Sequence, residues 1–99
     1  MAVYLIANLQ VHDLELHAEY RRLVPPLIAK HGGEYLVRGG AIEVIEGSWQ
    51  LDRLVVLRFP TREAFRAFYD DPDYAPLLAM RQRASTTDMI VADGVDAGA

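Results

Sequence analysis

Two glycine pairs, Gly32-Gly33 and Gly39-Gly40, bracket a mostly apolar segment of five residues, Glu34–Arg38. Glycine pairs interrupt regular structure because glycine adopts backbone angles that other residues avoid. The segment is therefore predicted to be a short strand, and the second pair is predicted to bend or bulge it. On this interpretation Gly40→Val should destabilise the protein strongly.

Patterns of period two and period 3.6 alternate along the rest of the chain. The first helix is predicted to begin at Leu14, with Asp13 as its cap, to break at Pro25-Pro26 and to end at His31. The second is predicted to be capped by Thr61 and to restart after Asp70-Asp71-Pro72, with Asp71 or Asp73 as the new cap. Strands are predicted at residues 2–11, 34–38, 41–46, 53–59 and 87–95.

This β-α-β-β-α-β order predicts a ferredoxin-like α+β fold, in which helices cover one face of an antiparallel four-stranded sheet. The length of 99 residues fits a single domain over residues 1–99. The opposite sheet face would carry the apolar side chains Tyr4, Ile6, Leu54 and Val56, too many to leave in water. We therefore expect a homodimer that pairs two such faces.

The composition excludes several partners. A net charge of −4 provides no basic field for nucleic acid. The chain has no cysteine, which excludes disulfides and thiolate chemistry and is compatible with a cytoplasmic location. The N-terminal segment has no basic region and its apolar run ends at Asn8, so neither a signal peptide nor a membrane span is expected.

The run GGEYLVRGG, followed by EVIEG, Trp49, RLVVLRFP, FYDDPDY and Arg81, resembles the domain of unknown function 1330 family. The resemblance implies a dimeric α+β barrel, formed when two ferredoxin-like subunits close their sheets together. That superfamily includes cofactor-independent monooxygenases, muconolactone-isomerase-like enzymes, chlorite dismutase and haem-degrading relatives, whereas the family itself implies no settled activity. Two positions depart from its pattern, with Arg58 where members commonly carry Glu and Asp71 where they commonly carry Ser.

Arg38 beside Gly39-Gly40 is the first candidate for a binding site. Glycines let a ligand approach the backbone, and a guanidinium grips a carboxylate or enolate. Alternatively, Arg38 forms an ion pair with Glu43, Glu46 or an acid on the partner subunit and stabilises a bulged strand. The full set of candidate ligand-binding residues is Tyr20, Arg38, Gly39, Gly40, Glu46, Trp49, Tyr69, Tyr74 and Arg81.

The three tyrosines of that set lie on helix faces that can ring a cavity, although ordinary packing explains them as well. Arg81 shares a helix face with Tyr74 and needs a partner, either an acid such as Asp71 or a bound anion. Arg38, His31 and Tyr74 are the catalytic candidates, with Arg38 holding an anion and a tyrosine or His31 moving a proton.

His17 is expected to be exposed, and no histidine has metal-ligand spacing, so no metal and no cofactor are expected. Two hypotheses remain open. In the first, the protein binds a small anionic or ring compound between sheet and helices, as a cofactor-independent isomerase or monooxygenase-like enzyme. In the second, it is a non-catalytic dimeric interaction or ligand-sensing protein. An unpaired Arg38 facing a cavity would favour the first.

Overall fold

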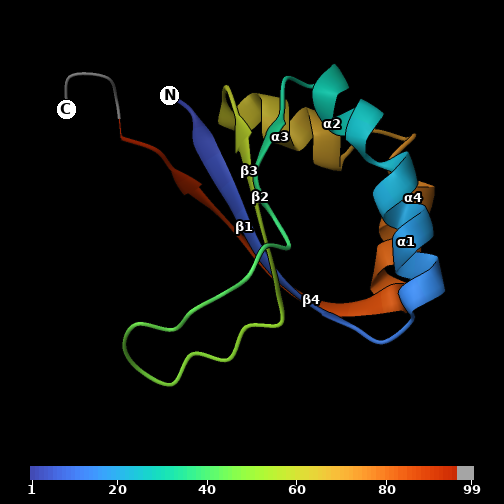
Figure 1. Cartoon of the computed structure of the whole chain (residues 1–99). Coiled ribbons are helices and arrows are strands. Elements are labelled where there is room, and N and C mark those ends of the chain that lie inside the picture. Colours follow the sequence, from blue (N-terminus) through green and yellow to red (C-terminus); the bar gives the residue numbers. More distant parts are fainter. Residues whose placement is uncertain (96–99) are drawn as a thin grey trace.

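The computed structural model describes residues 1–95 and confirms the ferredoxin-like α+β fold. The sheet has the strand order β2-β3-β1-β4, and every neighbouring pair is antiparallel. All the helices lie on one side of this sheet (Figure 1). In chain order the elements are β1 (Val3–Val11), α1 (Leu14–Leu23), α2 (Pro25–Lys30), β2 (Glu34–Arg38), β3 (Arg53–Phe59), α3 (Arg62–Tyr69), α4 (Ala75–Ala84) and β4 (Ser85–Asp93).

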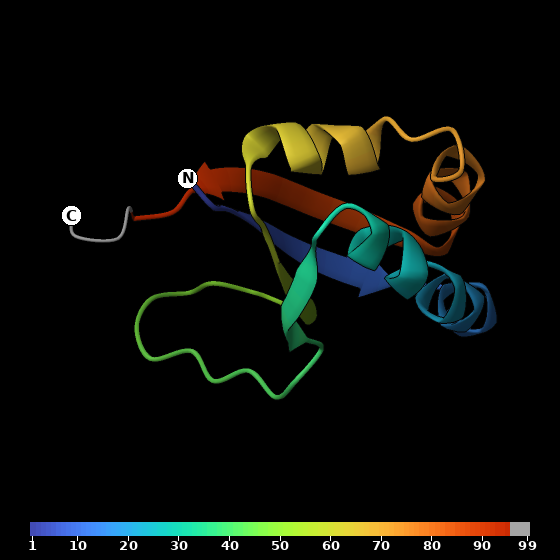
Figure 2. The same ribbon diagram turned by 90° about the horizontal axis from the view of Figure 1, so that it is seen from above.

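The core lies between the sheet and the helices. Figure 2 shows the same helices and strands from above. Alternate residues of β1 point into it, because successive side chains of a strand face opposite ways. Phe59 of β3 meets Phe65 and Phe68 of α3, with ring centroids 5.8 and 5.5 Å apart. This aromatic contact packs α3 against the sheet.

The expected helix starts are confirmed at two of three places. An Asp13 carboxylate oxygen accepts from the Leu16 N–H at 3.0 Å, and the Thr61 hydroxyl accepts from the Ala64 N–H at 3.0 Å. The first helix ends at Leu23 and restarts at Pro25, as the proline pair predicts. Neither Asp71 nor Asp73 caps α4, because Tyr74 occupies that position without a side-chain cap.

The predicted strand over residues 41–46 is absent from the described structure. Residues 39–52, which we call the arm, leave the sheet after β2 and return at β3 without regular structure (Figure 1). The arm carries exposed apolar side chains, with Ile45 79% and Trp49 75% exposed. An alternating pattern alone cannot form a strand, since its backbone groups need a neighbouring strand to pair with.

The irregularity in β2 lies at Leu36, where the register with β3 shifts between Tyr35 and Val37, and not at the glycines. The chain turns at Gly39, whose φ is +71°, while a Cβ at Gly40 would meet nothing within 4 Å. The expectation that Gly40→Val is strongly destabilising is therefore wrong in its premise. Gly39 is the residue that requires glycine.

The second sheet face is bare of helices in the described chain. Tyr4, Ile6, Leu54 and Val56 on this face are half-buried, and Ile90 of β4 is 59% exposed. None of the described helices is long and apolar enough to cross a membrane.

Candidate functional site

A half-enclosed cavity of about 50 Å³ lies between the sheet and α1, α3 and α4. Apolar side chains of β1 and β3 form its floor. Its polar lining contains four arginines, and no acidic residue among residues 1–95 lines it. In a chain of net charge −4, this cavity is locally cationic. The polar lining residues are His17, Tyr20, Arg21, Tyr35, Arg38, Arg53, Tyr74 and Arg81.

Tyr20, Tyr74 and Arg81 form one end of the cavity, where α1 meets α4. The two tyrosine hydroxyls lie 2.9 Å apart, so one donates to the other and the second proton has no acceptor within the pair. Arg81 is only 5% exposed, and its buried Nε–H has no hydrogen-bond partner. This end therefore presents more donors than acceptors, which costs stability unless an acceptor binds there.

The phenol of Tyr20 is held in its protonated form. Burial, followed by the neighbouring Tyr74, raises the pKa of Tyr20 far above its usual range. A protonated phenol donates a hydrogen bond to an anionic oxygen. The tyrosine pair and Arg81 therefore both offer hydrogen-bond donors at this end of the cavity.

Arg38 reaches the cavity because of the irregularity at Leu36. The shifted register brings Arg38 opposite Val55 and Tyr35 opposite Leu57, so both point to the helix side. The Arg38 guanidinium lies 4.5 Å from the Tyr35 ring centroid, and its Nη2 donates to the Arg21 carbonyl oxygen at 2.9 Å. It forms no ion pair with Glu43 or Glu46 in the described structure, so the expected internal acid partner is not found.

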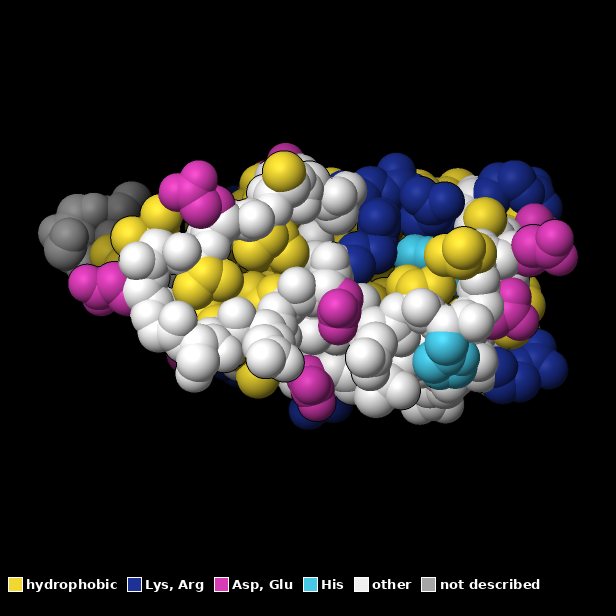
Figure 3. Space-filling view, turned by 60° about the horizontal axis from the view of Figure 1, so that its bottom comes forward, with side chains coloured by type: hydrophobic (Ala, Val, Ile, Leu, Met, Phe, Trp, Pro, Cys, Tyr) yellow, Lys and Arg dark blue, Asp and Glu magenta, His cyan; other side chains and the backbone are white. Residues whose placement is uncertain are grey.

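Arg53 brings a further positive charge beside Arg21 and Arg38, and we call this more exposed part of the cavity lining the entrance. Burial, followed by the charges of Arg21 and Arg38, lowers the pKa of Arg53. Its buried Nε–H, like that of Arg81, has no partner. Figure 3 shows basic side chains gathered beside a histidine and apolar side chains on this side of the molecule.

His17 is buried and lines the cavity, which corrects the expectation that it is exposed. Burial, then the charges of Arg53 and Arg21, lower the pKa of His17 to about 4. Its imidazole is therefore neutral at neutral pH. The signal was available in the sequence, because His17 is spaced three and seven residues from Tyr20 and Val24 of the buried stripe.

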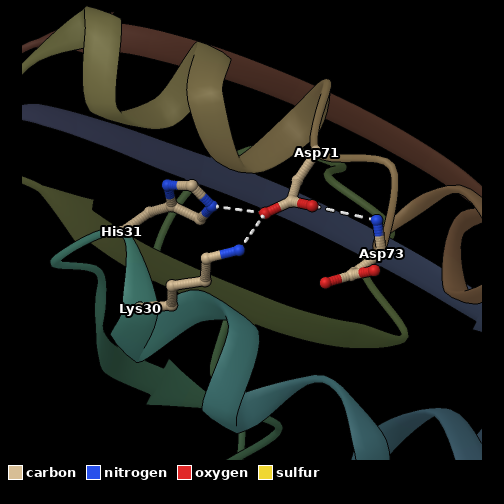
Figure 4. Close-up of polar contacts among 4 residues, drawn as sticks. All are labelled: Lys30, His31, Asp71 and Asp73. Carbon is tan, nitrogen blue, oxygen red and sulfur yellow. Dashed lines mark hydrogen bonds and ion pairs between the residues drawn. The ribbon is translucent and has the colours of Figure 1, made fainter.

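His31, a catalytic candidate, lies away from the cavity lining. Its Nε2 is 2.8 Å from an Asp71 carboxylate oxygen, and Lys30 Nζ donates to the same oxygen at 2.9 Å (Figure 4). The other Asp71 oxygen accepts from the Asp73 N–H at 2.9 Å. Asp71 therefore pairs with Lys30 and His31 and not with Arg81.

Several further candidates lie outside the cavity. Tyr69 faces a neighbouring groove that Arg81 also lines. Glu46, Trp49 and Gly40 belong to the arm, and Gly39 lies against the Arg53 guanidinium.

Arg58, where the resemblance expects Glu, faces the bare side of the sheet. It pairs with Glu34 of the neighbouring strand at 3.6 Å. Residues 1–95 contain no cluster of three or more His, Asp or Glu side chains that could hold a metal ion.

The fold and cavity define a ferredoxin-like α+β protein with a cationic pocket beneath its helices. Residues 2–95 match the family described as a domain of unknown function, DUF1330, and the chain belongs to this family. No curated protein matches the chain.

Solved structures share this fold at low sequence identity. A protein of unknown function from Rhodopseudomonas palustris, RPA0582, is 18% identical with a TM-score of 0.79, over 97% of this chain and 84% of that one. A dimeric ferredoxin-like protein of unknown function from Jannaschia sp. CCS1 is 11% identical with a TM-score of 0.72, over 95% and 100%. SnoaB, a cofactor-independent oxygenase from Streptomyces nogalater, is 16% identical with a TM-score of 0.62, over 97% and 95%.

Proposed function

We propose that this protein is a homodimer that binds a small organic anion with a planar ring between its sheet and helices. We further propose that it acts on this compound without a cofactor, as an isomerase or monooxygenase-like enzyme. The observation that carries the proposal is the cavity lining of four arginines without an acid among the described residues. An anionic ligand would supply the missing negative charge.

One end of the cavity and its floor support this assignment in different ways. Arg81 and the tyrosine pair offer buried donors for a carboxylate or enolate oxygen. Leu5, Ala7 and Leu57 provide an apolar floor on which a ring would lie. The cavity of about 50 Å³ is smaller than the ~150 Å³ that holds a benzene ring, so part of the ligand would lie in the open side of the cavity.

The homodimer is supported by the bare sheet face and by the solved dimeric relatives of the same fold. Enzymatic activity is supported by the likeness to SnoaB, which extends to the fold and not to its residues. Because the lining offers charge, donors and an apolar floor but no metal cluster within residues 1–95, proton and charge chemistry suits these side chains best.

The test is calorimetric titration with benzoate and with benzyl alcohol, which present a similar ring with and without a charge. We expect benzoate to bind with a dissociation constant below ~1 mM, equivalent to about −4 kcal/mol. Benzyl alcohol should bind at least about tenfold more weakly, since one lost charge-assisted hydrogen bond costs ~1.5–3 kcal/mol. Arg81→Gln should weaken benzoate binding by a similar factor.

Arg83→Gln is the matched control, because Arg83 lies on the same helix with an exposed side chain. If Arg81→Gln does not fold, Arg38→Gln at the more exposed entrance replaces it, with the same expected loss of benzoate binding. Equal binding of the two probes, or no binding of benzoate, would contradict the proposal.

A further inference from the structure

We propose that His17 is the proton acceptor of this cavity, and that the substrate is a weak O–H or C–H acid whose conjugate base lies against the arginines of the entrance. Phenols and enolisable carbonyl compounds belong to this class. The inference rests on the proposed function, because it requires that a small organic molecule enters the cavity.

His17 borders two adjoining spaces. It lines both the internal cavity and an outer groove between α1 and the start of β3. Its side of α1 also carries Tyr20, and the two rings are stacked with their centroids 6.2 Å apart. The imidazole is thus packed against a neighbouring ring and also borders both the cavity and the outer groove.

The charged groups around His17 come from several elements. Arg21 lies one turn along α1, Arg53 comes from β3 and Arg38 from β2, and all line the same cavity. Asp52 borders the outer groove only, and in the described structure it forms no ion pair with His17 or these arginines. The imidazole therefore has cations on the cavity side and no carboxylate to hold its proton there.

Elimination among the lining groups leaves His17 as the base. A guanidinium carries donors only and stays protonated. Burial raises the pKa of the Tyr20 and Tyr35 phenols, which therefore stay protonated, and the Tyr74 hydroxyl is hydrogen-bonded to Tyr20. A neutral imidazole always offers one nitrogen with a free lone pair. Among the described polar side chains of the lining, His17 is the group able to take up a proton.

The proton transfer balances without any further reactant. The O–H or C–H bond of the substrate breaks, its electron pair stays on the substrate as an enolate or phenolate, and the proton forms an N–H bond on His17. The new anion faces the guanidinium groups, while the imidazolium faces the anion. Return of the proton to a different atom of the same substrate completes an isomerisation, with no oxidant or cofactor consumed.

The arrangement makes His17 a base only when a substrate is present. In the empty cavity, burial and the neighbouring arginines oppose protonation of the ring. An anion beside the ring reverses that effect, because an opposite charge favours the imidazolium. The proton acceptor and the bound anion therefore stabilise one another.

The test uses 4-nitrophenol, whose phenolate absorbs visible light, at a pH where the free phenol is mostly un-ionised. We expect the bound probe to be the phenolate, and ¹⁵N NMR of histidine-labelled protein to show His17 changing from neutral to imidazolium on binding. His17→Gln should lower the bound phenolate at that pH at least about tenfold, equivalent to one unit of pKa. His12→Gln, an exposed histidine, should leave it unchanged.

The outcomes separate this inference from the proposed function. Bound phenolate with a neutral His17 would overturn the role of His17 and leave anion binding intact. Absence of 4-nitrophenol binding alone would overturn this inference, and absence of binding by both 4-nitrophenol and benzoate would overturn the proposed function as well. The NMR measurement uses the unmodified chain, so the inference can fail even if His17→Gln does not fold.

Discussion

At the scale of single residues, the structure requires glycine at the first position of the pair after β2, Gly39, and not at the second, Gly40. Gly39 has a φ of +71°, and its N–H donates to the Leu54 carbonyl at 2.8 Å. A Cβ on Gly39 would collide with the Arg53 guanidinium. The missing side chain of Gly39 thus makes room for an arginine of the cavity entrance.

We predict that Gly39→Ala and Gly40→Ala have different effects. Gly39→Ala should lower the free energy of unfolding by ~1–2 kcal/mol, the usual cost of a left-handed backbone for a residue with a Cβ. It should also weaken benzoate binding, because Arg53 must move. Gly40→Ala should change stability by less than ~0.5 kcal/mol, as for an unconstrained surface site. Urea denaturation and calorimetry measure both effects, and equal losses for the two variants would contradict this account.

The sequence predicts which residues lie together only where helical spacing is regular. Tyr20 and Tyr74 follow buried stripes, and the structure brings their hydroxyls together. Arg38 could not be assigned to a sheet face, because one extra residue at Leu36 reverses the side to which it points. The expected exposure of His17 is wrong because its helical spacing from Tyr20 and Val24 places it on the buried face of α1.

At the scale of elements, Asp71 ties α2 to the junction between α3 and α4. Its carboxylate is hydrogen-bonded to Lys30 and His31 at the end of α2 and accepts a hydrogen bond from the backbone N–H of Asp73 in its own turn. The His31 hydrogen bond, then those from Asp73 and Lys30, hold the pKa of Asp71 well below its usual range. This position, where the resemblance expects Ser, therefore gains an ionic link between helices.

We predict that this link makes stability depend on pH in the acid range. Because the folded-state pKa of Asp71 is lowered, its contribution is present above its unfolded pKa of ~3.9 and is lost as the pH falls through the folded value. Asp71→Asn should melt a few degrees below the wild type at pH 6, and the gap should close as the pH falls below ~4. Differential scanning calorimetry of both chains across this range measures the gap. A gap that stays constant with pH would show that the carboxylate charge has no part in it.

The strand boundaries show where a local sequence pattern is sufficient to predict an element. β2 and β3 begin and end where their patterns predict, because glycine pairs and Pro60 limit them. The segment Ala41–Glu46 has the same alternation but no strand beside it, so it joins the arm. Pairing between distant segments decides this difference, and the alternation of one segment carries no information about it.

At the scale of the whole molecule, the single subunit is less compact than its length predicts. Its radius of gyration is 14.0 Å, against ~12.6 Å for a compact chain of this length. Its thinnest dimension is 16 Å, since helices cover one face of the sheet and nothing described covers the other. A second copy on the bare face would complete the missing layer.

We predict that Ile90→Glu dissociates the proposed dimer and that Leu14→Glu does not. Ile90 lies on the bare face opposite Ile6 of β1, which in turn lies opposite Val56, so a carboxylate there would be buried without a partner in a face-to-face pair. Leu14, although 77% exposed and also apolar, lies on α1, on the opposite side of the sheet. Sedimentation velocity should give a dimer for the wild type and Leu14→Glu and a monomer for Ile90→Glu. A dimer that survives Ile90→Glu would mean that the bare face is not the subunit interface, and a wild-type monomer would contradict the proposed homodimer itself.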